Sequence, residues 1–512
     1  MTRGQKLVLS AIVSVSKQII ALGCGFVLLK YIIGYYGSTI NGLVSSITQF
    51  LGFIVLLEFG ISPVIQSNLY PYLARHNQQS VNDIYAASVS FFRKIAYIFL
   101  GYILVLIVVY PLFVNRNFAF LYTALLVLII SINSFAQYYW GISAQILINS
   151  DQKVYISASL QAITLLLNTV ISVILIMHGF SIHMVLLSTA CIYLLRPLGL
   201  NYYVVHYYHV SVQKNYTKDP IKQKWNGFAQ HLAAVICERS PIVFLTFFSV
   251  LSNVSVYAVY LTIIHGVSNL VMNLASGLDP LWGNMLARQE KKNLQRNFGL
   301  TEWFFHALIT SLFATTGMLI LPFVKIYTQH ISDANYQVPL LAFGLVAAYA
   351  MKCLRIPYFR MIKAAGHYRQ TQNGAFIQVG VSLILGLILI PPFQLLGAGF
   401  ALFVAMFYHT CYLAWYLREH IIKWPFRYFV QYILLDTITC LGIYLSTRSI
   451  LLTDISYHAW IWQAIKVFLI SCCLSLLMNL VFKPKNTHEA FSLLSVYLKK
   501  ISQLVVQKFR KQ

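Results

Sequence analysis

The sequence has little charge and very few acidic residues. Charged residues make up 10% of the 512 residues, and only 13 residues are aspartate or glutamate, whereas soluble domains carry about 25% charge. Hydrophobic residues account for 59% of the chain, and its mean hydropathy is +0.70. This composition excludes a water-soluble globular domain.

The motifs of several enzyme classes are also missing. The sequence contains no G-x-x-x-x-G-K-[ST] phosphate loop, no H-E-x-x-H zinc motif and no cysteine and histidine cluster with the spacing of a metal site. Its eight cysteines all fall within apolar stretches and lack the spacing of a disulfide framework. We therefore expect no cofactor, no bound metal and no ATP hydrolysis.

Long hydrophobic runs dominate what is present. They recur from Leu7 to Val481, and each is long enough to cross a hydrocarbon core of roughly 30 Å as a helix. The sequence thus predicts an all-α polytopic membrane protein with about fourteen transmembrane helices. The expected spans are 7–33, 40–68, 86–113, 118–144, 154–177, 182–206, 227–250, 254–278, 301–325, 337–358, 372–392, 396–417, 427–447 and 458–482.

Basic residues set the expected orientation. The 37 lysines and arginines give a formal net charge of +24, which would suggest nucleic acid binding in a soluble protein. Here they lie mainly in alternate loops, while the opposite loops hold little beyond Arg116, Lys325 and Arg448. This bias places both termini in the cytoplasm, and we expect no nucleic acid partner. Because every loop is short, no extramembrane catalytic domain fits, so an enzyme is not expected.

Two pairs of similar segments predict an internal repeat. Gly60 to Pro63 resembles Gly277 to Pro280, and residues 145–153 resemble 360–368. Six helices per copy give both copies the same orientation, with a pseudo-twofold axis along the membrane normal and a site between them. We expect a six-helix lobe at 1–210, a cytoplasmic linker at 211–226, a second lobe at 227–420, two additional helices at 421–484 and a basic amphipathic tail at 485–512.

The tail carries apolar residues at helical spacing. The apolar residues that recur every three or four positions, with lysines and an arginine nearby, are Phe491, Leu494, Leu498, Ile501 and Val505. This pattern predicts a helix on the inner leaflet. The alternative is a tail held at the membrane only by its charge.

Ionisable residues inside the expected spans indicate a polar interior, because a charge at mid-bilayer is costly unless it faces a cavity or a partner. Cations outnumber acids there, which predicts a cationic cavity for a phosphate-bearing substrate. For Arg239 the alternative is an ion pair with Glu238 or another helix. For Arg196, Lys352 and Arg355 the alternative is that the side chain extends to the membrane interface. The full set of candidates is Lys17, Arg239, Arg196, Lys352 and Arg355.

Acidic residues within or beside the spans offer further candidates. Glu58 and Asp279 lie near the repeated Gly-x-x-Pro breaks, and Glu238 precedes Arg239. Each of the three acids is expected either to coordinate a coupling ion or to have a structural role, such as capping a helix break, and Glu58 or Asp279 could instead pair with a cavity cation. Asp436 and Lys466, in the last two spans, are expected to form a stabilising pair.

Three segments carry a family resemblance. Residues 56–62, running on to Arg75, resemble the acidic, apolar and glycine signature after the second helix of bacterial polysaccharide flippases. Residues 396–401 resemble their small-residue twelfth helix, and 364–367 resemble their cytoplasmic turn before the eleventh. With fourteen spans, the chain resembles the polysaccharide flippase family of the multidrug/oligosaccharidyl-lipid/polysaccharide exporter superfamily. Glu58 stands where many members have aspartate.

The resemblance implies a function. Members of this family carry an undecaprenyl-diphosphate-linked oligosaccharide across the bacterial plasma membrane, from the inner to the outer leaflet, by alternating access. Such transport serves capsule, exopolysaccharide or O-antigen-type synthesis. The implied partners are the lipid-linked oligosaccharide, membrane lipids, a polysaccharide polymerase and glycosyltransferases. The alternatives are a cation-coupled exporter of the multidrug and toxin extrusion type, a lipid II flippase and, from another class, a membrane glycosyltransferase or polysaccharide polymerase.

Overall fold

The computed structural model describes residues 3–58, 60–114, 118–212, 228–275, 277–450 and 454–492. Within these ranges every regular element is helical and no strand occurs. The predicted all-α fold class is confirmed. Most of the predicted linker at 211–226 and of the predicted tail at 485–512 lies outside the described residues.

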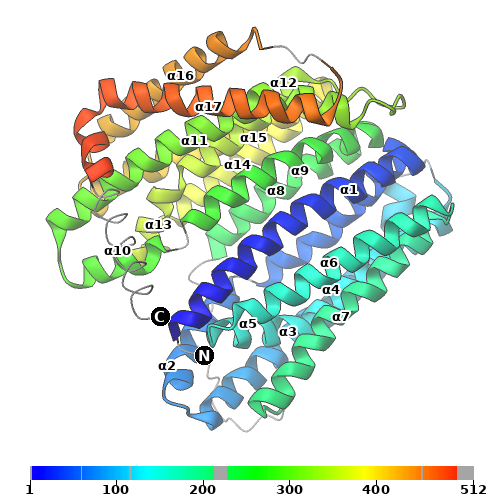
Figure 1. The fold of residues 1–512 in the computed structure, drawn as a ribbon. Coiled ribbons are helices and arrows are strands. Elements are labelled where there is room, and N and C mark those ends of the chain that lie inside the picture. Colours follow the sequence, from blue (N-terminus) through cyan, green and yellow to red (C-terminus); the bar gives the residue numbers. More distant parts are fainter. Residues whose placement is uncertain are drawn as a thin grey trace, which may run out of the picture. The chain divides into compact units, whose positions relative to one another are not determined.

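The helices agree closely with the expected spans (Figure 1). The expected span 154–177, for example, coincides with one observed helix. The helices are α1 (Arg3–Gly52), α2 (Ile61–Ala74), α3 (Gln78–Val109), α4 (Phe120–Ala136), α5 (Ile142–Ser150), α6 (Val154–Met177), α7 (Ile182–Tyr208), α8 (Phe228–Phe248), α9 (Leu251–Leu274), α10 (Leu278–Ala287), α11 (Lys291–Tyr327), α12 (Pro339–Leu354), α13 (Ile356–Ala364), α14 (Gln372–Phe393), α15 (Leu395–His420), α16 (Phe426–Thr447) and α17 (Tyr457–Phe482).

Among the described residues, 13 helical segments are long and apolar enough to cross a membrane. The first of them extends over 50 residues, Leu9–Glu58, or about 75 Å at 1.5 Å per residue, which is more than twice a bilayer core. Its helix α1 is broken at Gly37, where φ is 84° and ψ is 166°. This segment therefore covers most of the first two expected spans, and the 13 segments correspond to all fourteen.

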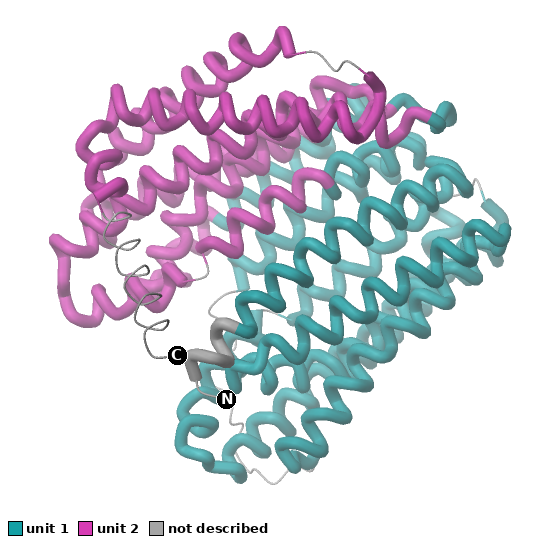
Figure 2. Tube along the Cα trace, in the orientation of Figure 1, with its two compact units in different colours: residues 1–262, 330–335, 375–398 teal, residues 263–329, 336–374, 399–512 magenta. Residues whose placement is uncertain are grey.

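The chain forms two compact units (Figure 2). Unit 1 comprises residues 1–262, 330–335 and 375–398, and unit 2 comprises 263–329, 336–374 and 399–512. In unit 1, α1 packs along α6, and α6 along α7 (Figure 1). In unit 2, α11 packs against α12, α16 and α17. The lobes expected at 1–210 and 227–420, and their symmetry, remain predictions.

Helix α6 illustrates why these segments require a bilayer. Thr164, Asn168 and Ser172, spaced four residues apart, are buried, whereas the apolar Ile163 and Ile174 are exposed. This is the reverse of a soluble amphipathic helix. Hydrocarbon is a favourable environment for the outer face, and polar groups on the inner face form bonds between helices. The hydroxyl of Ser172, for example, lies 3.4 Å from that of Thr189 in α7.

Helix α1 makes a close backbone contact with the start of α9. A Cβ atom on Gly42 would lie 1.8 Å from the carbonyl oxygen of Leu251, so this position accepts only glycine without movement of the backbone. Next to it, the Asn41 amide donates a hydrogen bond of 2.7 Å to the Ser255 hydroxyl. This contact fixes the second half of α1 within unit 1.

We predict that Gly42→Ala lowers the stability of the protein by about 1–3 kcal/mol, because the added methyl group forces α1 and α9 apart. Gly34→Ala is the matched control, since a Cβ there meets no atom within 4 Å and alanine favours helix. Thermal unfolding of the purified variants checks this. Equal unfolding midpoints for the two variants would contradict the proposed contact.

Candidate functional site

Unit 1 contains two adjoining cavities with polar and charged side chains in their walls. The larger, of about 320 Å³, is lined by Glu58, Tyr138 and Arg239 among others. The smaller, of about 160 Å³, is lined by polar residues that include Gln145, Gln161 and Arg196. Because Asn133 and Gln137 line both, the cavities are neighbours. They are named the large cavity and the small cavity.

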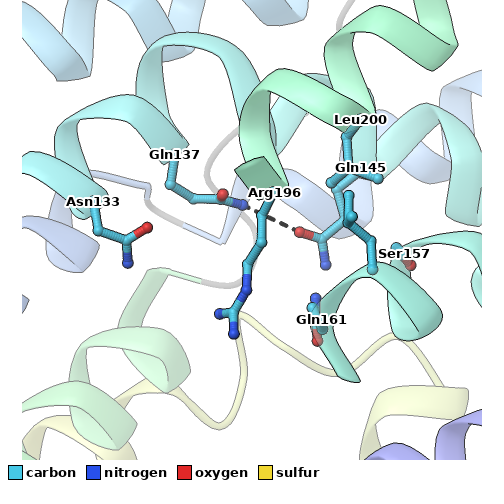
Figure 3. A pocket seen from close by; sticks show the side chains of 8 residues that line it. Asn133, Gln137, Gln145, Ser157, Gln161, Arg196 and Leu200 are labelled. Atoms are coloured by element: carbon cyan, nitrogen blue, oxygen red, sulfur yellow. Dashed lines mark hydrogen bonds between the residues drawn. The ribbon is translucent and has the colours of Figure 1, made fainter. Parts of the chain in front are cut away.

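Irregular helix geometry creates space at these cavities. Between α4 and α5 lies a π-helical segment, Gln137–Gly141, and π segments inside helices are frequent at functional sites. The Gln137 side-chain amide donates to Gln145 Oε1 at 3.2 Å (Figure 3). A Cβ on Gly141 would lie 2.5 Å from Gln137 Oε1, so glycine leaves room for this side chain. Across the large cavity, Glu58 ends the 3₁₀ segment Phe53–Glu58.

Arg196 is the cation of the small cavity. Its side chain extends into the space between Asn133 and Gln161 (Figure 3). Its Nε donates to the Thr164 hydroxyl at 2.5 Å, and its guanidinium lies 3.9 Å from the ring centroid of Tyr193, a cation–π distance. Its Nη2 is buried and has no hydrogen-bond partner among the described residues. Arg196 therefore keeps an unused donor beside a polar cavity.

Arg239 and Lys17 approach the same cavities from other helices. Arg239 lines the large cavity, and its Nη1 donates to Gln49 Oε1 at 2.9 Å. Lys17, in α1, donates from Nζ to Gln161 Oε1 at 3.4 Å, and Gln161 lines the small cavity. Three of the five expected cations are thus gathered around the cavity pair.

The other two expected cations, Lys352 and Arg355, belong to unit 2 and do not line either cavity. The Lys352 ammonium lies 5.0 Å from the ring centroid of Tyr349. Arg355 Nη1 lies 2.6 Å from His409 Nδ1. Their expected part in a substrate cavity therefore remains a prediction.

The three candidate acids have different surroundings. Glu58 lines the large cavity and accepts a hydrogen bond of 2.7 Å from the Tyr138 hydroxyl. Glu238 and Asp279 are not among the residues that line either cavity. Asp279 Oδ2 accepts from Arg360 at 2.8 Å and from Lys363 at 2.9 Å, which ties α10 to α13. These contacts favour the structural alternative for Asp279.

Neutral amides are the residues that sequence reasoning missed. Asn133, Gln137, Gln145 and Gln161 line the cavities, whereas every candidate expected from the sequence is ionisable. The sequence did contain an indication of these amides. Asn133 and Gln137 lie four residues apart within one expected span, so they share one helix face and mark it as polar. Amides both donate and accept hydrogen bonds. The cavities therefore offer neutral polar contacts as well as positive charge.

Solved structures share the architecture of this chain, although no family model and no curated protein matches its sequence. A lipid II flippase, MurJ, in an inward closed conformation aligns with a TM-score of 0.69 at 13% identity, over 93% of this chain and 98% of that one. An inward-facing multidrug resistance MATE transporter of the MOP superfamily aligns with a TM-score of 0.58 at 11% identity, over 81% of this chain and 99% of that one. A mutant of the Vibrio cholerae MATE transporter VcmN aligns with a TM-score of 0.51 at 12% identity, over 82% of this chain and 98% of that one.

The chain has the fold of MurJ and the MATE transporters. It is a multi-pass membrane protein, as its 13 apolar helical segments in the described ranges also indicate. At 11–13% identity the likeness concerns the fold alone. Membership of the polysaccharide flippase family stays a prediction.

We predict that the two cavities contain water. The thiol of an Asn133→Cys variant, at a position that lines both, should react with a charged, water-soluble thiol reagent, because the reactive thiolate forms only where water reaches it. Leu128→Cys is the matched control on the same helix, since Leu128 is exposed on the apolar outer surface. Mass spectrometry would separate the labelled site from the eight native cysteines. No labelling at position 133 would mean that the cavities are closed to water.

Proposed function

We propose that the chain is a flippase that moves an undecaprenyl-diphosphate-linked oligosaccharide from the inner to the outer leaflet of a bacterial plasma membrane by alternating access. The observation that carries this proposal is the gathering of Lys17, Arg196 and Arg239 around the cavity pair of unit 1. The fold shared with a lipid II flippase supports it.

The cations suit a diphosphate. Guanidinium groups bind phosphate oxygens in a bidentate manner, and such charge-assisted bonds are stronger than neutral ones. Arg196 has an unpaired buried Nη2 among the described residues, and an anion at this point would supply the missing acceptor. Among the residues that line the two cavities, Glu58 is the one acid, against Arg196 and Arg239. The balance of charge therefore favours an anionic ligand.

The amides suit a sugar. Asn133, Gln137, Gln145 and Gln161 can donate to and accept from hydroxyl groups, and the large cavity of about 320 Å³ is at the lower end of the range for ligand sites. A prenyl chain would stay in the bilayer. Outward movement of anionic charge is favoured by an inside-negative potential, by about 2.3 kcal/mol per charge per 100 mV. No nucleotide is needed for this step.

A lipid II flippase is the second candidate, because the MurJ structure covers 93% of this chain and a lipid-linked diphosphate is again the expected anchor. A cation-coupled multidrug exporter would need an acidic ion site, whereas among the residues that line the two cavities Arg196 and Arg239 outnumber the one acid, Glu58. We assign no enzymatic step to the chain. Polysaccharide polymerase and glycosyltransferases are proposed partners, and both termini are proposed to be cytoplasmic because of the distribution of lysine and arginine.

We predict that Arg196→Gln and Arg239→Gln each weaken binding of undecaprenyl diphosphate at least about tenfold, because a hydrogen bond to a charged group contributes about 1.5–3 kcal/mol. Arg196→Lys keeps the charge but loses the planar guanidinium, so its affinity should lie between those of the wild type and Arg196→Gln. Lys94→Gln is the control, since it removes an exposed cation of α3. Binding is measured on purified protein in detergent by native mass spectrometry.

Reconstitution in liposomes tests the transport itself. Undecaprenyl diphosphate carrying a fluorescent disaccharide should change leaflet in the presence of the wild type, and more slowly with either arginine variant. Lipid II, offered in the same assay, distinguishes the two candidate substrates. Binding that is unchanged in both arginine variants would remove the cavity pair from the substrate pathway.

A further inference from the structure

A second charged cluster lies in unit 2, where α11 meets α13 and the segment before α16. Glu302 of α11 is 0% exposed. The Tyr358 hydroxyl donates to Glu302 Oε1 at 2.5 Å, and the Trp424 indole donates to Oε2 at 2.8 Å. Both carboxyl oxygens therefore have a donor. Glu302 lies inside a membrane-spanning segment, where a buried ionisable residue marks a functional site.

His306 lies one turn further along α11, on the same face as Glu302, and is 1% exposed. Its Nδ1 lies 2.5 Å from Asp436 Oδ2 of α16. Its ring stacks on Tyr432 of α16, with 4.7 Å between ring centroids. The expected pairing of Asp436 with Lys466 is thus wrong, because α16 turns Asp436 toward α11, while Lys466 of α17 is exposed.

The other ring nitrogen of His306 is unpaired. Nε2 is buried and finds no hydrogen-bond partner in the part of the chain that the structure describes. Burial of a polar atom without a partner is costly. His306 therefore keeps one site that can hold or release a proton without breaking its contact with Asp436.

The three groups form a unit that differs by one proton between two charge states. Counted with both acids ionised and His306 as imidazolium, Glu302, His306 and Asp436 carry one net negative charge, which is costly to bury, and the cation that acts on Glu302 from outside the three is Lys483. One additional proton makes Glu302, His306 and Asp436 neutral as a group. The cluster thus has two charge states that differ by one proton and that need no large movement of its side chains.

Charged groups on the neighbouring elements are few or already paired. Lys483, just after α17, lies 4.7 Å from the ring centroid of Tyr432 and donates to Gln431 at 2.8 Å. Burial lowers the pKa of Lys483, and the nearby Glu302 raises it. From α17, Ser475 donates to the Ala307 carbonyl of α11 at 3.1 Å, and the titratable Cys472 contacts Ser311 of α11.

The two remaining elements against α11 add no unpaired acid to the cluster within the described ranges. On α10, the acid Asp279 is held by Arg360 and Lys363 of α13. On α12, Lys352 is in the last turn, with its ammonium beside the ring of Tyr349. The acidic groups that face the cluster from these packed elements are therefore those of the cluster itself.

The side chains of this cluster do not converge on one point. In the described ranges, no group of three or more histidine, cysteine, aspartate or glutamate residues is arranged to hold a metal. Glu302 and His306 each point their polar atoms to separate partners, Tyr358 and Trp424 for the first and Asp436 for the second. A proton needs only a single acceptor atom, so it suits such a spread set of groups.

We propose that Glu302, His306 and Asp436 together take up and release one proton, and that this proton is the coupling ion of transport. The second part rests on the proposed function; the first does not. The site differs from the three acids expected from the sequence. It also involves α16, one of the two helices beyond the predicted six-helix lobes, in the energetics of transport.

Infrared spectroscopy of the full chain in liposomes tests proton uptake. The carbonyl band of a protonated carboxyl should grow in the wild type when the medium is taken from about pH 8 to about pH 5, a range that brackets physiological pH. Glu302→Gln and Asp436→Asn should each abolish that change. Glu419→Gln, which removes an exposed acid of α15, should retain it. A band change that survives in both Glu302→Gln and Asp436→Asn overturns the proton site. If one of these variants does not fold, the other still gives the test.

A flipping assay tests the coupling. Liposomes contain the protein and undecaprenyl diphosphate carrying a fluorescent disaccharide, and the membrane potential is clamped while a pH gradient is imposed. The gradient should change the wild-type rate several-fold and leave the rates of Glu302→Gln and His306→Gln unchanged, with lipid binding intact because Arg196 and Arg239 are untouched. A wild type that flips without responding to the gradient overturns the coupling and leaves the proposed function standing. A wild type that does not flip overturns the proposed function, whatever the infrared result.

Discussion

The structure depends on one constraint, which is that polar groups inside a bilayer must find partners within the protein. Helices satisfy the backbone, and the side chains follow the same requirement. In α6 it buries Thr164 and Asn168 and exposes Ile163. It also explains why Arg196 lies beside the Tyr193 ring and the Thr164 hydroxyl. The donors that remain unused after this pairing are the ones available to a ligand.

Much of the fold could be predicted, because spanning a bilayer is a matter of length and hydrophobicity. Helix α6 matches its expected span. The break in α1 at Gly37 falls in the gap left between the first two expected spans. Depth along a helix can also be estimated by counting residues, and this count places Lys17 and Arg239 well inside their spans. The lobe boundaries and their symmetry depend on contacts between helices that are far apart in the sequence, and they remain predictions.

Partner choice could not be predicted in the same way. Each residue turns by about 100° around a helix, so depth alone does not tell which neighbour a side chain faces. Asp436 contacts His306 rather than the expected Lys466. Glu302 lies at the edge of its expected span, and the sequence gives no sign of its contacts with Tyr358 and Trp424. These contacts depend on the rotation of α11 and α16, which hydrophobicity does not determine.

The π segment Gln137–Gly141 has a mechanical consequence. A π turn holds one residue more than an α turn, so shifting that extra residue along the chain twists the following helix α5 by about 100° relative to α4. Such a twist would separate the amides of Gln137 and Gln145. A screw motion within one continuous segment can therefore change the chemical lining of both cavities while the surrounding helices keep their positions.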